Sequence, residues 1–165
     1  MSQPARRTYI LFRCHAWICA FPSVAAQRLV AVDEAVSVSQ QVDLRPMVTV
    51  GSEAYVAWNL GALLGAPDVE GGWLLLQAHA PSQRPPLALR VGQHLTVLDL
   101  ESSLPLPSST FQTRREAFTG AFQLPVGLTH GQPPFGVLLE PRALWTAVEL
   151  QAARLAWDTH QTAHR

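Results

Sequence analysis

A strand followed by a short helical turn occurs twice in this chain, and the spacing of the two copies constrains the fold more than any other feature. In the first copy, residues 55–65 (YVAWNLGALLG), four residues with strand propensity lead through a polar residue into an apolar turn closed by glycine. The second copy, residues 136–145 (GVLLEPRALW), follows 81 residues later, close to half the length of the 165-residue chain. This spacing predicts two similar modules, each ending in a buried strand and a helical turn. The matched positions are Val56 with Val137, Ala62 with Ala143, Leu63 with Leu144, and Asn59 with Glu140 at the strand exit.

The composition permits a large apolar core and argues against a nucleic-acid partner. Hydrophobic residues make up 48% of the chain and charged residues only 15%, which suits one domain or two small barrels that share an interface. The formal net charge is zero and there is no run of basic residues, so the positive surface that binds a phosphate backbone is missing. The 13 prolines and 10 glycines are spread along the chain, which predicts many turns and short strands.

Alternating apolar residues predict β-strands along most of the chain. Within residues 29–38, Val30, Val32, Val36 and Val38 have the same parity and are expected on one face of a strand. Residues 23–28, which follow Pro22, are expected to form a short helical segment. The expected strands are residues 9–14, 17–21, 29–38, 47–50, 55–58, 73–78, 87–91, 95–100, 116–124 and 136–139.

The C-terminal part of the chain changes from strand to helix periodicity. Leu144, Val148 and Leu155 recur at helical spacing, with Trp145, Ala152 and Ala156 beside them, so the helix is expected to pack on the rest of the protein through this face. The predicted helix covers residues 141–157, with Pro141 in its first turn, where the missing N–H group costs nothing. Residues 158–165 are expected to be a frayed tail.

Two cysteines and a histidine near the N-terminus suggest a metal or thiol site. Cys14 and Cys19 are five positions apart, with His15 between them, and no second pair of ligands follows at the spacing of a zinc site. By strand parity both cysteines can point inward from a hairpin, where free cysteine behaves as a small hydrophobic residue. Packing is therefore the favoured interpretation, and a thiol- or metal-binding protein that uses these three residues is an alternative.

The sequence contains no pattern that assembles a catalytic centre. It has no HExxH motif, no serine in a Gly-x-Ser-x-Gly frame and no glycine-rich phosphate loop, and its six histidines fall in separate expected elements. We therefore expect a protein that is not an enzyme and that binds no cofactor. The apolar run at residues 8–13 is too short for a signal peptide or a membrane span, so a cytoplasmic protein without membrane insertion is expected.

Several segments, taken in order along residues 8–150, resemble the CheW family of bacterial chemosensory adaptors. Residues 8–13 (TYILFR) and 19–25 (CAFPSVA) are similar to the family's opening, a strand with Phe and then a helical turn of the form apolar-Pro-x-x-Ala. Residues 56–65 are similar to its PVVDLRRLLG stretch, with Asn59 in place of the usual Asp.

Segments in the second half of the chain also resemble the CheW family. Residues 116–124 (EAFTGAFQL) resemble the EYLTGL segment, and residues 136–145 resemble the last strand and the start of the C-terminal helix. The resemblance implies a mainly β fold of two SH3-like, five-stranded barrels within one domain, residues 8–150. With residues 67–72 as the hinge, the first barrel is expected at residues 8–66 and the second at residues 72–140.

The resemblance also implies a function and a set of partners. Members of the family are non-enzymatic scaffolds that couple the cytoplasmic tips of chemoreceptors to a CheA-type histidine kinase, so we expect these partners and a position at receptor arrays. An alternative is an interaction module with the same fold in another assembly, such as a motility or polarity complex. The residues expected to contact partners are Arg28, Val30, Val36, Val38, Gly51, Ser52 and Glu53.

This chain departs from the family pattern at the positions where partner contact is expected. The family commonly has an Arg-Gly pair where this chain has Gly51 and Ser52, and it tends to have a carboxylate where this chain has Arg28. The usual glycine-containing first turn is replaced here by His15 and its neighbours. Because a reversed charge at an interface rejects former partners, the departures predict a diverged adaptor that has lost either kinase or receptor binding.

Overall fold

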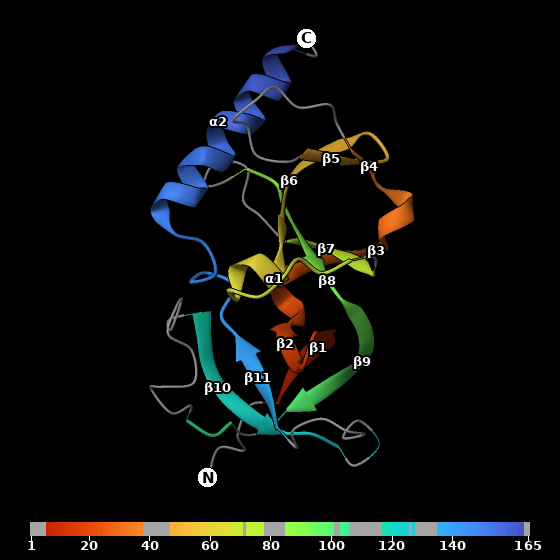
Figure 1. The fold of residues 1–165 in the computed structure, drawn as a ribbon, viewed down its shortest axis with the longest axis vertical. Coiled ribbons are helices and arrows are strands. Elements are labelled where there is room, and N and C mark those ends of the chain that lie inside the picture. The colour runs from red at the N-terminus through yellow and green to blue at the C-terminus, as the bar shows by residue number, and fades with distance from the viewer. Residues whose placement is uncertain are drawn as a thin grey trace.

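The protein consists of two curled β-sheets and a C-terminal helix, as shown by a computed structural model (Figure 1). The model describes residues 6–37, 47–70, 72–77, 85–100, 103–105, 117–125, 127 and 135–163. The strands are β1 Arg7–Cys14, β2 Trp17–Pro22, β3 Ala26–Ala31, β4 Val36–Ser37, β5 Met47–Val50, β6 Glu53–Asn59, β7 Trp73–Gln77, β8 Leu87–Val91, β9 Gln93–Leu100, β10 Phe118–Gln123 and β11 Phe135–Leu139. The helices are η1 Ser23–Ala25, η2 Val32–Glu34, α1 Leu60–Leu63 and α2 Ala147–Ala163, where η marks a 3-10 helix.

The strands are divided between a five-stranded and a six-stranded sheet. The five-stranded sheet has the order β10-β11-β2-β1-β9, and the six-stranded sheet has the order β3-β7-β8-β6-β5-β4. The two-residue strand β4 is the sixth strand of the larger sheet. In Figure 1 the five-stranded sheet occupies the lower half of the molecule, and α2 runs beside β6 in the upper half. The prediction of a mainly β fold with two sheets of this kind and a C-terminal helix is confirmed.

The predicted boundary between the two barrels does not match the strand pairing. β1 pairs with β9, and β2 pairs with β11, so the first two strands belong to the sheet that the last three complete. The six-stranded sheet is formed by the strands between residues 26 and 91. It is therefore inserted between β2 and β9 of the other sheet, and neither residues 8–66 nor residues 72–140 contain one complete sheet.

Both sheets nevertheless repeat one arrangement around the two matched valines. β6 runs parallel to β8 with Val56 opposite Leu87, and β11 runs parallel to β2 with Val137 opposite Cys19. Without β4, the order β5-β6-β8-β7-β3 corresponds strand by strand to β10-β11-β2-β1-β9. The first half of the chain thus contributes β1 and β2 to the five-stranded sheet and β3 to β6 to the six-stranded sheet. The second half contributes β7 and β8 to the six-stranded sheet and β9 to β11 to the five-stranded sheet.

The helical turn after β6 also follows the predicted pattern. Asn59 caps α1 because its Oδ1 accepts a hydrogen bond from the Gly61 amide at 3.0 Å, and Gly65 closes the turn with φ 71°. At the matching position, Oε1 of Glu140 accepts a hydrogen bond from the Arg142 amide at 3.2 Å. Two different side chains thus accept a hydrogen bond from the amide two residues later at the same strand exit.

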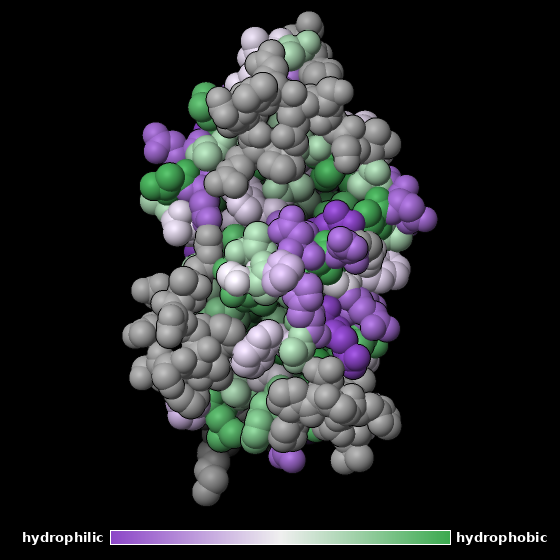
Figure 2. Space-filling view, in the orientation of Figure 1, coloured by the Kyte–Doolittle hydropathy of each residue, from purple (hydrophilic) through white to green (hydrophobic). Residues whose placement is uncertain are grey.

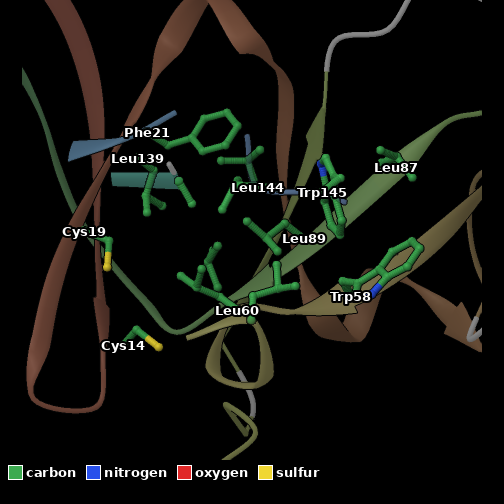
Figure 3. Packing of buried hydrophobic residues seen from close by; sticks show 14 of the residues in the cluster. Cys14, Cys19, Phe21, Trp58, Leu60, Leu87, Leu89, Leu139, Leu144 and Trp145 are labelled. Atoms are coloured by element: carbon green, nitrogen blue, oxygen red, sulfur yellow. The ribbon is translucent and has the colours of Figure 1, made fainter. Parts of the chain in front are cut away.

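Alternation along the strands separates the buried side chains into three clusters. One lies on the inner face of the five-stranded sheet and includes Leu11, and a smaller one lies on the inner face of the six-stranded sheet and includes Leu76. The largest cluster joins both sheets and α2. It includes the ten residues labelled in Figure 3: Cys14, Cys19, Phe21, Trp58, Leu60, Leu87, Leu89, Leu139, Leu144 and Trp145.

The C-terminal helix differs from the prediction in its bounds and in its packed face. It begins at Ala147 because Thr146 and Glu149 form a capping box: the Glu149 amide donates to Thr146 Oγ1 at 3.2 Å, and the Thr146 amide donates to Glu149 Oε2 at 2.9 Å. Leu144 therefore precedes the helix. Val148 and Leu155 are 75% and 62% exposed, and the packed face contains Ala153 and Ala156. The helix continues to Ala163, through most of the predicted tail.

Two further expectations for residues 23–38 are wrong. Helical structure covers only Ser23–Ala25, because residues 26–31 form β3 and pair with β7. The predicted strand over residues 29–38 is interrupted by η2, Val32–Glu34. Local propensity predicted a helix followed by one long strand. Long-range pairing with β7 and the 3-10 helix η2 override that propensity here.

Candidate partner-binding surface

The turn between β5 and β6 presents Gly51, Ser52 and Glu53 to solvent. Val50 pairs with Glu53, so Gly51 and Ser52 form a two-residue hairpin turn. Gly51 has φ 62°, a left-handed conformation that suits glycine at the first position of such a turn. An Arg at this position would be strained, and the turn geometry therefore accounts for glycine at residue 51.

Charged side chains from β3, η2 and β6 form two side-chain contacts in the six-stranded sheet and the segments that connect its strands. Arg28 Nη2 is 3.6 Å from Glu34 Oε2, with 60% and 53% of the two side chains exposed. The Tyr55 hydroxyl donates a hydrogen bond to Glu53 Oε2 at 2.5 Å. Burial, followed by this hydrogen bond and the Glu53 charge, raises the pKa of Tyr55 to about 12, and the positive charge of Arg28 opposes that rise. Arg28 is thus close enough to act electrostatically on the Tyr55 phenol.

Of the other expected contact residues, the structure describes the side chain of Val30. Val30 is only 1% exposed and belongs to the inner cluster of the six-stranded sheet, so its side chain packs inside the fold and not on the outer surface as expected. Val36 lies in β4, paired with Thr49, and Val38 lies outside the described residues. Gly51, Ser52 and Glu53 thus share one exposed turn, and Arg28 lies within electrostatic range of Tyr55, which contacts Glu53.

Arg28 already forms an ion pair with Glu34 within the chain. Its positive charge, where the family tends to have a carboxylate, is therefore partly balanced before any partner binds. An exposed ion pair with Glu34 contributes at most about 1 kcal/mol to stability. The pair can therefore separate at little cost when a partner presents a stronger acceptor. Arg28 contributes a positive group to this surface, and Glu34 and Glu53 contribute negative groups.

The three residues of the alternative thiol or metal site do not form one ligand cluster. Cys14 and Cys19 are free and buried in the largest core cluster (Figure 3). His15 is exposed, with φ 53°, and its Nε2 donates to the Pro67 carbonyl at 2.7 Å. Within the ranges that the structure describes, no three His, Cys, Asp or Glu side chains are grouped in a way that would hold a metal ion.

The two thiols should be unreactive in the folded protein. Burial raises the pKa of Cys14 from 9.0 to about 11, and burial followed by the neighbouring Cys14 raises the pKa of Cys19 further. A rise of this size lowers the thiolate population about a hundredfold at pH 8. We expect Ellman's reagent at pH 8 to label both cysteines at least that much more slowly in buffer than in concentrated urea. Rapid labelling of the native protein would support the alternative that Cys14 and Cys19 form a reactive thiol site.

A pocket that the sequence patterns did not predict lies between strands of the six-stranded sheet, η2 and the segment that follows α1. Its volume is about 230 Å³. Asp68, from the segment that follows α1, is exposed, as is Glu70, and Figure 2 shows hydrophilic side chains over this part of the molecule. The pocket is lined by Val32, Ala35, Val48, Ala57, Trp58, Asn59, Asp68, Leu74 and Arg90.

Comparison with known proteins identifies the fold. The chain is similar to the crystal structure of the scaffolding protein TtCheW from Thermoanaerobacter tengcongensis, with a TM-score of 0.65 and 10% sequence identity, over 87% of this chain and 90% of that one. No protein-family model matches the sequence, and no curated protein matches it either. In the part of the chain that the structure describes, no helix is long and apolar enough to cross a membrane. The fold is therefore CheW-like.

Proposed function

We propose that this protein is a non-enzymatic, CheW-like adaptor that couples chemoreceptors to a CheA-type histidine kinase in the cytoplasm, at receptor arrays. The observation that supports this proposal best is the likeness to a scaffolding protein over 87% of the chain. The order of the CheW-like sequence segments over residues 8–150 supports it independently. Work of this kind requires complementary outer surfaces and no reactive group.

One of the two partner interactions is weakened in this chain. Arg28 replaces the carboxylate that the family tends to carry, and it forms an exposed ion pair with Glu34. A partner surface that complements a carboxylate at this position would meet a cation instead, which costs affinity and slows association. The adaptor would therefore bind one partner fully and the other weakly.

Direct binding measurements test both parts of the proposal. The purified full-length chain is titrated, by calorimetry, against the CheA-type kinase and against a receptor cytoplasmic fragment from the same genome. Arg28→Glu restores the negative sign and should raise the affinity of the weaker complex about tenfold. Arg142→Glu makes the same charge change at another exposed position and should leave both affinities unchanged.

The outcomes of these titrations are separable. Full-strength binding of both partners by the unaltered chain would contradict the weakened interaction and leave the adaptor function standing. Binding of neither partner, by the unaltered chain or by Arg28→Glu, would contradict the adaptor function itself. That result would favour an interaction module of the same fold in another assembly.

A further inference from the structure

The outward face of α2 carries an apolar row where a surface helix is normally polar. Val148 and Leu155 are 75% and 62% exposed, and they lie two helical turns apart on the same face. Ala152 lies between them, and Thr159 continues the row. In Figure 1, α2 lies at the edge of the molecule, where a partner can reach this face. Steps of four, three and four residues form the narrow seam along which two helices pack, and these four residues are called the α2 seam below.

The hydroxyl groups along the α2 seam are already satisfied within the helix. The Thr159 hydroxyl donates a hydrogen bond to the Leu155 carbonyl at 2.8 Å. Thr162, the next residue in the row, donates in the same way to the Asp158 carbonyl at 3.0 Å. A hydroxyl that is bonded to its own helix can be covered without leaving a donor unpaired. Another helix can therefore cover the seam without the cost of burying an unsatisfied polar group.

The α2 seam is complementary to itself when two copies of the helix run antiparallel. If Ala152 of one copy lies opposite Leu155 of a second copy, two-fold symmetry places Leu155 of the first opposite Ala152 of the second. One turn further along, Val148 of each copy lies opposite Thr159 of the other, and these two side chains have similar shapes. A parallel pair in register would instead place leucine against leucine and alanine against alanine. That arrangement crowds one layer and leaves a gap in the next.

Polar side chains beside the seam also favour the antiparallel arrangement. Gln151 and Asp158 are exposed and lie on the same side of the α2 seam. In an antiparallel pair that side of one helix faces the same side of the other, so the Gln151 amide of each copy meets the Asp158 carboxylate of the second copy. In a parallel pair Gln151 would face Ala156, which is already buried against the rest of the protein. Antiparallel helix dipoles also attract each other.

We propose that the α2 seam binds a second copy of this chain as an antiparallel helix pair. The four seam residues together with Gln151 and Asp158 make the contact, whereas a stable complex uses about 20–30 residues a side. The dimer is therefore weak and reversible, monomeric in dilute solution and dimeric in concentrated solution. The seam lies outside the turn between β5 and β6, and the pairing does not depend on the function proposed above.

Analytical ultracentrifugation of the full-length protein, from about 10 μM to about 1 mM, tests the self-association. We expect the average mass to rise from that of the monomer toward twice that value. Val148→Glu places a charge in the seam and should weaken self-association at least about tenfold. Val24→Glu makes the same change at a residue of η1 that is 89% exposed, and it should leave self-association unchanged.

Leu155→Glu is a second variant in case Val148→Glu does not fold. A monomer at every concentration would overturn the proposal. Undiminished dimerisation by a folded seam variant, or equal weakening by Val24→Glu, would overturn it as well, because the copies would then meet through another surface.

Cysteine cross-linking tests the orientation of the two helices. Gln151→Cys and Asp158→Cys, mixed in equal amounts and oxidised with diamide, should form a disulfide between the two variants. Each variant alone should cross-link far less, and mass spectrometry distinguishes the mixed product from the like ones. The unaltered chain is the control, because Cys14 and Cys19 are buried. Cross-links between like variants that match those of the mixture would contradict the antiparallel register.

Discussion

Residues 1–70, produced without the rest of the chain, are expected to remain unfolded. This fragment contains β1 to β6, but the pairing partners of β1 and β2 in the five-stranded sheet, β9 and β11, are missing. The partners of β3 and β6, which are β7 and β8, are missing as well. Of the strand pairs that the structure describes, only hairpins between sequence neighbours remain, and an isolated hairpin is marginally stable at best in water. Amide NMR spectra should be poorly dispersed, and urea denaturation should show no cooperative transition.

Two matched fragments test whether this result arises because the two halves of the chain exchange strands between the sheets. Residues 23–91 have nearly the same length but contain every strand of the six-stranded sheet, so they should show dispersed amide signals. Residues 71–165 added to residues 1–70 should restore a folded spectrum and a one-to-one complex in size-exclusion chromatography. A cooperative unfolding transition of residues 1–70 alone would contradict the topology, because it would mean that the first sequence repeat folds as a complete barrel.

Gly136→Ala should destabilise the protein by about 3 kcal/mol or more, although alanine normally suits a strand better than glycine. A Cβ atom at this position would lie 2.3 Å from Cζ and 2.6 Å from Cε1 of the Phe122 ring. The ring is 2% exposed and packed in the inner cluster of the five-stranded sheet, so it has little room to move. Urea denaturation monitored by circular dichroism measures the loss.

A double-mutant cycle separates the clash from other causes. Phe122→Leu shortens the side chain that the new Cβ would meet, so the double variant should be more stable than the sum of the two single effects by at least about 1 kcal/mol. Gly127→Ala is the matched control, because a Cβ atom there would have no neighbour within 4 Å among the described residues, and it should change stability by less than about 0.5 kcal/mol. If the two single effects are strictly additive, contact with the Phe122 ring is not the cause of the stability lost in Gly136→Ala.

Periodicity and the repeat made several elements predictable. β1, β2, β5 and β8 lie within two residues of their expected positions, because alternation of apolar side chains is a local property of a strand. The strand exit at Asn59 and Glu140 was also predictable, since its turn is formed by residues adjacent in sequence. Part of the candidate surface was predictable for the same reason, because Gly51 and Ser52 form a local hairpin turn.

Val30 and α2 were predicted less well because their burial depends on distant strands. Alternation places Val30 on one face of a strand, but pairing with β7 decides that this face is inside. Helical spacing groups Val148 with Leu155, but the cap at Thr146 starts the helix late and leaves both exposed. A face is buried only when another element covers it, and periodicity does not identify that element.

The sequence alone therefore determined that this chain forms two related sets of strands with a helix after them, because strand propensity, alternation and local turn chemistry act over a few residues. Only the tertiary structure decided which strands share a sheet, because pairing between β1 and β9 joins residues far apart in the chain.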